Sequence, residues 1–81
     1  MDDPAVEVHL FAAARAAVGT SVLSVGPGRL FAILDALEAE HPAFAAVRPR
    51  CSYLVDGTAI HSDVEVGAGS RIDVLPPFAG G

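Results

Sequence analysis

Residues 71–81 read RIDVLPPFAGG, and this stretch joins a strand pattern to a tail of prolines and glycines. From Arg71 to Leu75 polar and apolar side chains alternate, which is the period of a strand with one buried face. The two prolines that follow fix φ and lack the N–H that a sheet ladder needs, so the strand is predicted to end at Leu75. We therefore expect residues 1–75 to form one folded domain and residues 76–81 to form its extended tail.

Four more strands are indicated upstream of this stretch. Tyr53–Val55 and Thr58–Ile60 flank Asp56-Gly57, and an Asp-Gly pair between apolar runs is a strong signal for a two-residue hairpin. Near the N-terminus two further apolar runs are separated by a short alanine-rich segment, so they should also pair as an antiparallel hairpin. The second of these runs ends at Gly26-Pro27-Gly28, which is interpreted as a turn. The five expected strands are 6–11, 21–25, 53–55, 58–60 and 71–75.

One amphipathic helix is predicted between the two hairpins, over residues 29–40. Its apolar side chains recur at the spacing of a single helix face, and we expect it to be the single core helix. It should end by His41, because Pro42 disfavours the helical conformation of the residue before it. The apolar face consists of Leu30, Ile33, Leu34 and Leu37. Short helical turns are also expected at 12–18 and 43–47.

These elements follow one another in the order ββαβββ. This is an α+β arrangement, a mixed sheet of about five strands with one main helix and an extended C-terminal Gly-Gly tail. The chain has 81 residues, fewer than the usual domain size of about 100–200 residues, so one domain is expected. A domain of this size has a thin core and little room for an enclosed active site. Elaborate catalysis is therefore disfavoured.

The charged residues argue against two classes of partner. Five arginines, no lysine and ten acidic residues give a net charge of -5, which disfavours nucleic acid and anionic membranes. Cys51 is the only cysteine, so neither an internal disulfide nor a cysteine-based zinc site can form. The sequence begins Met1-Asp2-Asp3-Pro4, without the segments of a signal peptide, and no apolar run is long enough to span a membrane. A cytoplasmic location is expected.

The tail carries the functional prediction. Gly80 and Gly81 have no side chains, so a terminal carboxylate could enter a channel too narrow for any Cβ. A carboxylate is a poor electrophile, but a partner enzyme that uses ATP could convert it to an acyl adenylate, which sulfur or amine nucleophiles attack. The product would be a thiocarboxylate or an acyl bond to another molecule. The alternative is a frayed chain end without a function.

Four stretches resemble the β-grasp (ubiquitin-like) sulfur carriers, and most closely the small subunit of molybdopterin synthase. The terminal Pro-Pro-x-x-Gly-Gly is the specific part of this resemblance. One loop departs from the family pattern, because the turn glycine Gly69 is followed by Ser70 where the family commonly has an aspartate. The four stretches are Val8–Ala12 with Arg15 and Val18–Thr20, the helix around Leu34 and Leu37, Val55–Thr58, and Val74–Gly81.

The resemblance implies a role for the end of the chain. In that family the terminal glycine, Gly81 here, is adenylated by an enzyme similar to the ubiquitin activators and is sulfurated to a thiocarboxylate. The large subunit of molybdopterin synthase then takes the tail into its active site, and sulfur goes into a cyclic pyranopterin. This implies a non-catalytic carrier with no bound cofactor, while the activating enzyme uses ATP. Sulfur delivery to thiazole or cysteine synthesis, and conjugation as a ubiquitin-like protein modifier, are the alternatives.

The resemblance also implies that partners grip a hydrophobic patch beside the tail, so partner-binding residues are expected in two places, the tail and this patch. Phe78 is apolar and lies in an extended tail, so a pocket on the partner is its natural place. One helix covers only one face of a sheet, so some apolar strand residues must face outward; simple core packing is the alternative for these. The expected tail contacts are Pro76, Pro77, Phe78, Ala79 and Gly80. The expected patch consists of Leu75, Phe11 and Ile60.

The remaining candidates carry weaker patterns. No His, Lys or Asp is positioned near Cys51 in the sequence to activate it, so a partly buried and inert thiol is expected. His9, His41 and His61 lie on different predicted elements, and no metal site is predicted from them. His41 is instead expected at the C-terminus of the helix, where a cation interacts favourably with the helix dipole.

Overall fold

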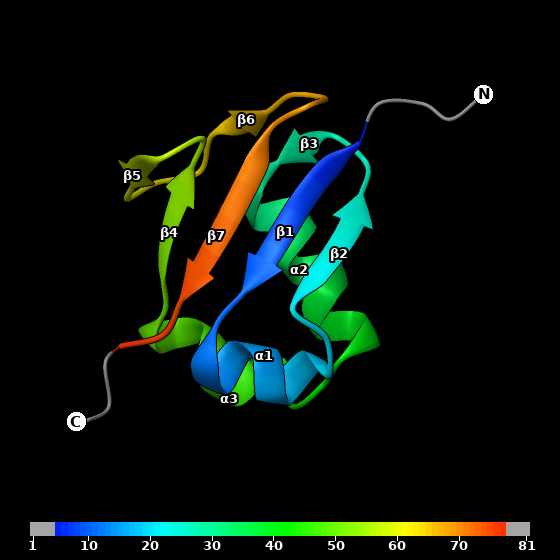
Figure 1. The fold of residues 1–81 in the computed structure, drawn as a ribbon, viewed down its shortest axis with the longest axis vertical. Helices are drawn as coiled ribbons and strands as arrows, with labels where there is room; N and C mark the ends of the chain where they lie inside the picture. The colour runs from blue at the N-terminus through cyan, green and yellow to red at the C-terminus, as the bar shows by residue number, and fades with distance from the viewer. Residues whose placement is uncertain (1–4, 78–81) are drawn as a thin grey trace.

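A computed structural model describes residues 5–77 and shows a five-stranded sheet with the order β2-β1-β7-β4-β5 (Figure 1). β1 and β7 run parallel to each other, whereas the other neighbouring strands are antiparallel. The mixed α+β sheet predicted from the sequence is confirmed, and β7 lies at its centre. The strands of this sheet are β1 (Val6–Leu10), β2 (Val22–Val25), β4 (Ser52–Val55), β5 (Thr58–Ile60) and β7 (Arg71–Leu75).

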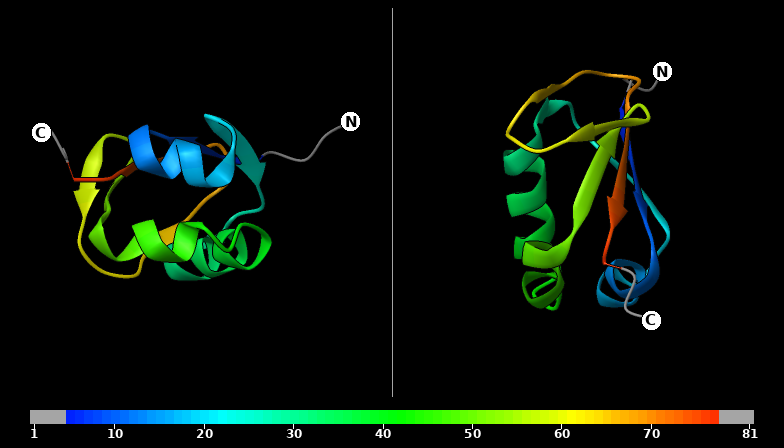
Figure 2. Two further views of the ribbon diagram at one scale, coloured as in Figure 1. Left: turned by 90° about the horizontal axis from the view of Figure 1, so that it is seen from below. Right: turned by 90° about the vertical axis from the view of Figure 1, so that its left-hand side faces the viewer.

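The helices cover one face of the sheet and one of its ends. α2 (Leu30–Glu40) is the main helix and lies across one face of the sheet (Figure 2). The short helices α1 (Ala12–Val18) and α3 (Phe44–Val47) pack against each other at the end where β1 and β7 finish. The 3-10 turn η1 (Arg48–Arg50) follows α3 and leads into β4.

The register of the sheet explains which strand residues are buried. Val8 pairs with Ile72 and Leu10 pairs with Val74, and all four side chains are buried on the face that α2 covers. Side chains alternate along a strand, so the residues between them point to the opposite face. Among residues 5–77, no helix lies on that opposite face, which is called the outer face below (Figure 2).

The hairpin between β4 and β5 has the two-residue turn that the sequence predicts. Val55 pairs with Thr58, and φ is 50° at Asp56 and 83° at Gly57. A type I′ turn requires positive φ at both central residues, which Asp-Gly adopts more easily than most pairs. The turn places β5 at one edge of the sheet, while β2 forms the other edge.

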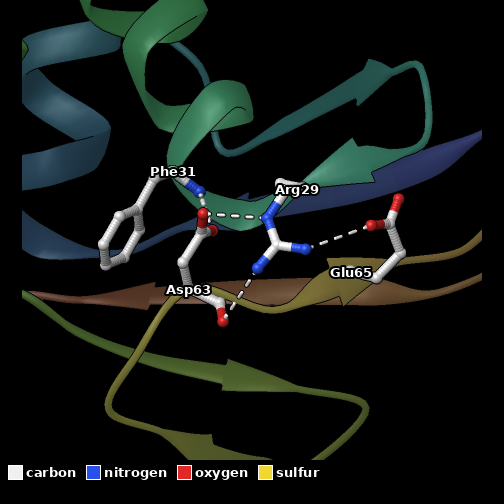
Figure 3. A network of polar contacts seen from close by, with 4 residues as sticks. All are labelled: Arg29, Phe31, Asp63 and Glu65. Atoms are coloured by element: carbon white, nitrogen blue, oxygen red, sulfur yellow. Dashed lines mark hydrogen bonds and ion pairs between the residues drawn. The ribbon is translucent and has the colours of Figure 1, made fainter.

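A second, smaller sheet was not predicted. Gly28–Arg29 forms β3, which pairs antiparallel with β6 (Glu65–Val66). The interpretation of Gly26-Pro27-Gly28 as a turn therefore holds only for its first two residues. Asp63, in the loop before β6, accepts hydrogen bonds from the Arg29 Nε at 3.0 Å and from the Phe31 backbone N–H at 2.8 Å (Figure 3). Two-residue strands have no detectable period in a sequence, which is why this pairing was missed.

The core draws on all three α-helices. α2 contributes the face predicted for it, and its buried residues are the four expected ones. The expectation of a single core helix was wrong, because Ala14 and Val18 of α1 are buried and Phe44 of α3 is fully buried. The first strand also ends one residue earlier than expected, and Phe11 becomes the N-cap residue of α1.

Candidate functional site: the root of the tail

The last described residues leave the end of the central strand. β7 lies between β1 and β4, and its final residue Leu75 pairs with Ser52 of β4. Pro76 is partly buried, and Pro77 is exposed. The predicted carrier residue Gly81 and the tail contacts Phe78, Ala79 and Gly80 lie outside the described residues. The site is therefore built from the residues that surround this point, which we call the tail root.

Phe11 stands beside the tail root. Its backbone N–H donates to the carbonyl oxygen of Val74 at 3.3 Å, which continues the parallel pairing of β1 and β7 by one residue. The extended backbone of Phe11, with φ -120° and ψ 152°, turns its side chain to the face opposite Leu10. The side chain is 40% exposed. Leu75 comes after the core-facing Val74, so its side chain points to the same outer face as Phe11, and these two patch residues are neighbours.

Ile60 occupies a different face from the other two patch residues. It pairs with Tyr53, which in turn pairs with the buried Val74 of β7. Directly opposed residues point to the same side of a sheet, so Ile60 faces the core side, and it packs there against the buried cluster. The structure therefore brings Phe11 and Leu75 together but places Ile60 on the opposite face of the sheet.

A small groove lies between the tail root and the helical end of the molecule. Its volume is about 160 Å³, and it is mostly apolar. It is lined by Ala13, Ala46, Val47, Arg50, Pro76 and Pro77. Because the two prolines form one wall, whatever fills this groove contacts the start of the tail.

Arg50 is the only charged side chain in this groove, and sequence reasoning missed it. Within residues 5–77 it has no ion-pair partner, whereas Arg48, two residues earlier, contacts Asp35 at 2.7 Å and Glu38 at 3.2 Å. The signal that could have found it is the Arg48-Pro49-Arg50 sequence, which places two cations together in an acidic chain. Arg50 therefore supplies positive charge next to the tail root.

The environment of Cys51 agrees with an inert thiol. Its side chain is partly buried, and its Sγ lies 3.5 Å from the carbonyl oxygen of Val47. Burial raises the pKa of this thiol, so the reactive thiolate is disfavoured. Burial also raises the pKa of the neighbouring Tyr53 to about 12, and its hydroxyl donates to the carbonyl oxygen of Arg48 at 3.3 Å. Both side chains pack against the buried core.

The three histidines do not converge. His9 lies on the outer face of β1 and contacts Glu7 at 2.9 Å, and His41 is the C-cap residue of α2, as predicted. In the part of the chain that the structure describes, no group of three or more His, Cys, Asp or Glu side chains could hold a metal ion. Over the same residues, no helix is long and apolar enough to cross a membrane.

Solved structures of similar shape support this fold over nearly its full length. The solution structure of small archaeal modifier protein 1 from Methanosarcina acetivorans is 25% identical with a TM-score of 0.83, and the match covers 96% of this chain and 97% of that chain. The crystal structure of the same-named protein from Haloferax volcanii is 27% identical with a TM-score of 0.81, covering 95% and 99%.

A third structure contains a partner subunit. The complex of subunits 1 and 2 of the molybdopterin-converting factor from Helicobacter pylori matches with 22% identity and a TM-score of 0.71, covering 95% of this chain and 99% of that chain. This likeness shows the fold alone.

Sequence comparison gives the family directly. No curated protein matches the chain. The model of the ThiS family, however, matches residues 8–81, which include most of β1, all of β7 and the whole tail. With the β-grasp fold confirmed by the strand order and by the structural matches, the chain belongs to the ThiS family of β-grasp sulfur carriers.

Proposed function

We propose that this protein is the small, sulfur-donating subunit of a molybdopterin synthase. The observation that carries the proposal is that the last described residues leave the end of the central strand β7 beside the exposed Phe11, and that Pro77 is exposed. A central strand is held on both sides by hydrogen bonds, so it gives the tail a fixed point of departure. The reactive carbon would be the carboxyl carbon of Gly81.

The chemistry proceeds in two balanced steps. A carboxylate oxygen of Gly81 attacks the α-phosphorus of ATP on an adenylyltransferase similar to the ubiquitin activators, which forms the acyl adenylate and releases pyrophosphate. A hydrosulfide equivalent then attacks the acyl carbon, and the carbon–oxygen bond to AMP breaks. The products are the thiocarboxylate, AMP and a proton. The thiocarboxylate is the nucleophile that the synthase large subunit would use on a cyclic pyranopterin.

The protein's own residues would bind and position rather than catalyse. Phe11 and Leu75 present apolar surface beside the tail root, and Arg50 adds a positive charge on its other side. The glycines at the tip would let the carboxylate pass through a narrow channel of the partner. ATP would be bound by the activating enzyme.

Two features favour the molybdopterin pathway over other sulfur-accepting pathways. The double proline Pro76-Pro77 matches the small subunits of molybdopterin synthase, whereas the carriers for thiazole synthesis usually lack it and those for cysteine synthesis tend to have one proline. The Helicobacter pylori structure, moreover, pairs a chain of the same fold with subunit 2 of the molybdopterin-converting factor. By analogy we propose a synthase large subunit as the second partner of this chain.

Intact-mass analysis tests the carrier role. Protein isolated from its native host should contain a fraction in which one oxygen is exchanged for one sulfur at the C-terminus, and a variant lacking Gly81 should not. Absence of that fraction under every growth condition would contradict the proposal. The pathway is tested by deleting the gene: loss of molybdenum-enzyme activity supports it, whereas a requirement for thiamine or cysteine contradicts it.

The structural matches also favour a second candidate, a protein modifier joined to lysines of other proteins through Gly81. Two of the similar structures are named as small archaeal modifiers. This chain has no lysine, so it could not form chains on its own side chains. After trypsin digestion a modified lysine would carry a remnant that begins at Ile72, because Arg71 is the last arginine. Finding that remnant on other proteins would establish the modifier role.

A further inference from the structure

The edge strand β2 has no charged side chain, no proline and no bulge, three of the features that usually protect a sheet edge. Natural edge strands are shielded by charged side chains, prolines, bulges or short length. β2 reads Val22-Leu23-Ser24-Val25 and contains no charge and no proline. The opposite edge, β5, is one residue shorter. β2 is therefore the edge that offers more unpaired backbone to another strand.

The direction of its hydrogen bonds shows which backbone groups are free. Leu10 donates to the carbonyl oxygen of Ser21 at 2.8 Å, so these two form a hydrogen-bonded pair of the antiparallel ladder. Such pairs alternate with non-hydrogen-bonded ones, so Val22 and Ser24 direct their N–H and C=O groups away from β1. The hydroxyl of Thr20 donates to the carbonyl oxygen of Val22 at 3.3 Å. Ser24 keeps both a donor and an acceptor directed toward the open edge.

A groove of about 450 Å³ lies directly beside this edge, between β2 and α2. Its lining is mainly apolar. Ala32 and Ala36 are exposed on α2 where larger side chains would fill the space. Leu23 and Val25 face it from the strand. A strand added to β2 would direct alternate side chains into this groove.

The groove carries charge at only one end. Glu40, the last residue of α2, lines it and has no ion-pair partner among residues 5–77. α2 begins only a few residues after β2 ends, so the two run in opposite directions and Glu40 lies toward the Leu23 end of the strand. A basic side chain on an occupant would pair with Glu40, and the acidic net charge of -5 favours such an occupant.

We propose that the groove between β2 and α2 binds an extended apolar peptide segment of another protein, which adds a strand to β2 at Ser24 and places a basic residue at Glu40. Main-chain hydrogen bonds to an open edge supply affinity in this binding mode, and pockets for alternate side chains supply specificity. The groove is lined by β2 and α2. The tail leaves from the end of β7, which is separated from β2 by β1 (Figure 1). The protein could therefore be held through β2 while its tail is in use.

The test uses the full chain and a fluorescein-labelled peptide, Ser-Val-Ile-Val-Ile-Lys, with blocked ends. In an antiparallel arrangement its C-terminal lysine lies at the Glu40 end. Binding should increase the fluorescence anisotropy, shift the backbone amide signals of Leu23–Val25 in NMR spectra, and slow the hydrogen exchange of the Ser24 amide. The same peptide with glutamate in place of lysine should bind less tightly.

Two matched variants on α2 locate the site. Ala36→Glu places a charge in the apolar groove and should weaken binding roughly tenfold or more, because the carboxylate would lose water without gaining a partner. Ala39→Glu makes the same change on an exposed residue of the same helix that does not line the groove. It should leave binding unchanged. Glu40→Gln should weaken binding of the lysine peptide about two- to fivefold and should not weaken binding of the glutamate peptide.

Three results would overturn the proposal. The first is equal weakening by Ala36→Glu and Ala39→Glu, which would reflect net charge alone. The second is amide shifts on the outer face around Phe11 and Leu75 in place of β2. The third is a concentration-dependent dimer of the free protein with slowed exchange at Ser24, which would identify a second copy of this chain as the occupant. None of these readouts depends on Gly81, so they are independent of the sulfur-carrier proposal.

Discussion

Asp63 caps α2 from a position 32 residues further along the chain than the residue it binds: its Oδ1 accepts the backbone N–H of Phe31 at 2.8 Å (Figure 3). The N-cap residue of the helix, Arg29, makes no side-chain cap of its own, and its guanidinium contacts the same carboxylate at 3.0 Å. The neighbouring Leu30 N–H donates to the carbonyl oxygen of Val64 at 2.8 Å. The loop before β6 thus supplies partners for the unsatisfied donors of the first helical turn.

This contact should make the stability of the protein sensitive to acid. The Phe31 N–H and the Arg29 guanidinium hold the pKa of Asp63 below its ordinary value. A group whose pKa is lower in the folded state stabilises the fold above its unfolded pKa, and this stabilisation is lost as pH falls through the folded pKa. We expect the urea midpoint to decrease below about pH 4, and Asp63→Asn to show a smaller decrease between about pH 6 and pH 3.

The control for this prediction is Glu40→Gln, which removes one negative charge that has no ion-pair partner among residues 5–77. It should keep the pH dependence of the original protein. If Asp63→Asn and the original chain lost stability in parallel over the acid range, the carboxylate of Asp63 would not be the group responsible.

Phe44 should be the most sensitive aromatic position in the fold. Its side chain is fully buried between the short helices and the sheet, so Phe44→Ala should lower the free energy of unfolding by about 3–5 kcal/mol. Such a loss could unfold a small domain, so Phe44→Leu is the more informative variant and should cost about 1 kcal/mol. Phe31→Ala is the matched control, because Phe31 is 45% exposed and should lose much less. Equal losses in urea unfolding would contradict the assigned core.

Ala12 has a positive φ of 49° at the start of α1, next to the tail root. The left-handed region costs a residue with a Cβ roughly 1–2 kcal/mol, and glycine avoids this cost but loses about 0.5–1 kcal/mol in chain entropy. Ala12→Gly should therefore raise the free energy of unfolding slightly. Ala16→Gly, on an exposed position of the same helix, should lower it by about 1 kcal/mol. Destabilisation of similar size in both variants would show that Ala12 is not strained.

Some of these features follow from local sequence and others do not. The Asp56-Gly57 turn and the apolar spacing of α2 are local signals, and both predict the structure correctly. The β3–β6 pair and the cap by Asp63 depend on contacts between distant segments, which no local period reveals. Phe44 lies in a helix of four residues, too short to show a face.

Ile60 was expected in the patch beside the tail, but it packs against the core. The run Tyr53-Leu54-Val55 is apolar throughout, so its alternation does not show which side is buried. Only pairing with β7 decides this, because Tyr53 stands opposite the buried Val74. For Leu75 the local sequence was sufficient. β7 alternates between polar and apolar residues, so the sequence shows its buried side, and Leu75 was correctly expected to face away from Val74.

Mutations of the expected patch residues should have different effects, because these residues lie on two different faces of the sheet. Phe11→Ala and Leu75→Ala should raise the KM of the activating enzyme for this protein roughly fivefold or more, with little change in kcat, because these residues lie on the outer face beside the tail. Ile60→Ala should mainly lower thermal stability, because Ile60 packs against the core. The measurements are ATP–pyrophosphate exchange and thermal unfolding. A large rise in KM for Ile60→Ala without loss of stability would contradict this division.

Arg50 gives the sharpest electrostatic prediction, because it is the one charged residue in the groove at the tail root and lies in a chain of net charge -5. Arg50→Glu should slow association with the activating enzyme several-fold at low salt, and the effect should shrink as salt screens the charge. Arg15→Glu makes the same change in net charge on an exposed residue of α1 that does not line the groove. If both variants slowed association equally, the overall charge would be responsible. A slower rate for Arg50→Glu alone would show that the partner contacts the wall of the groove from which the tail departs.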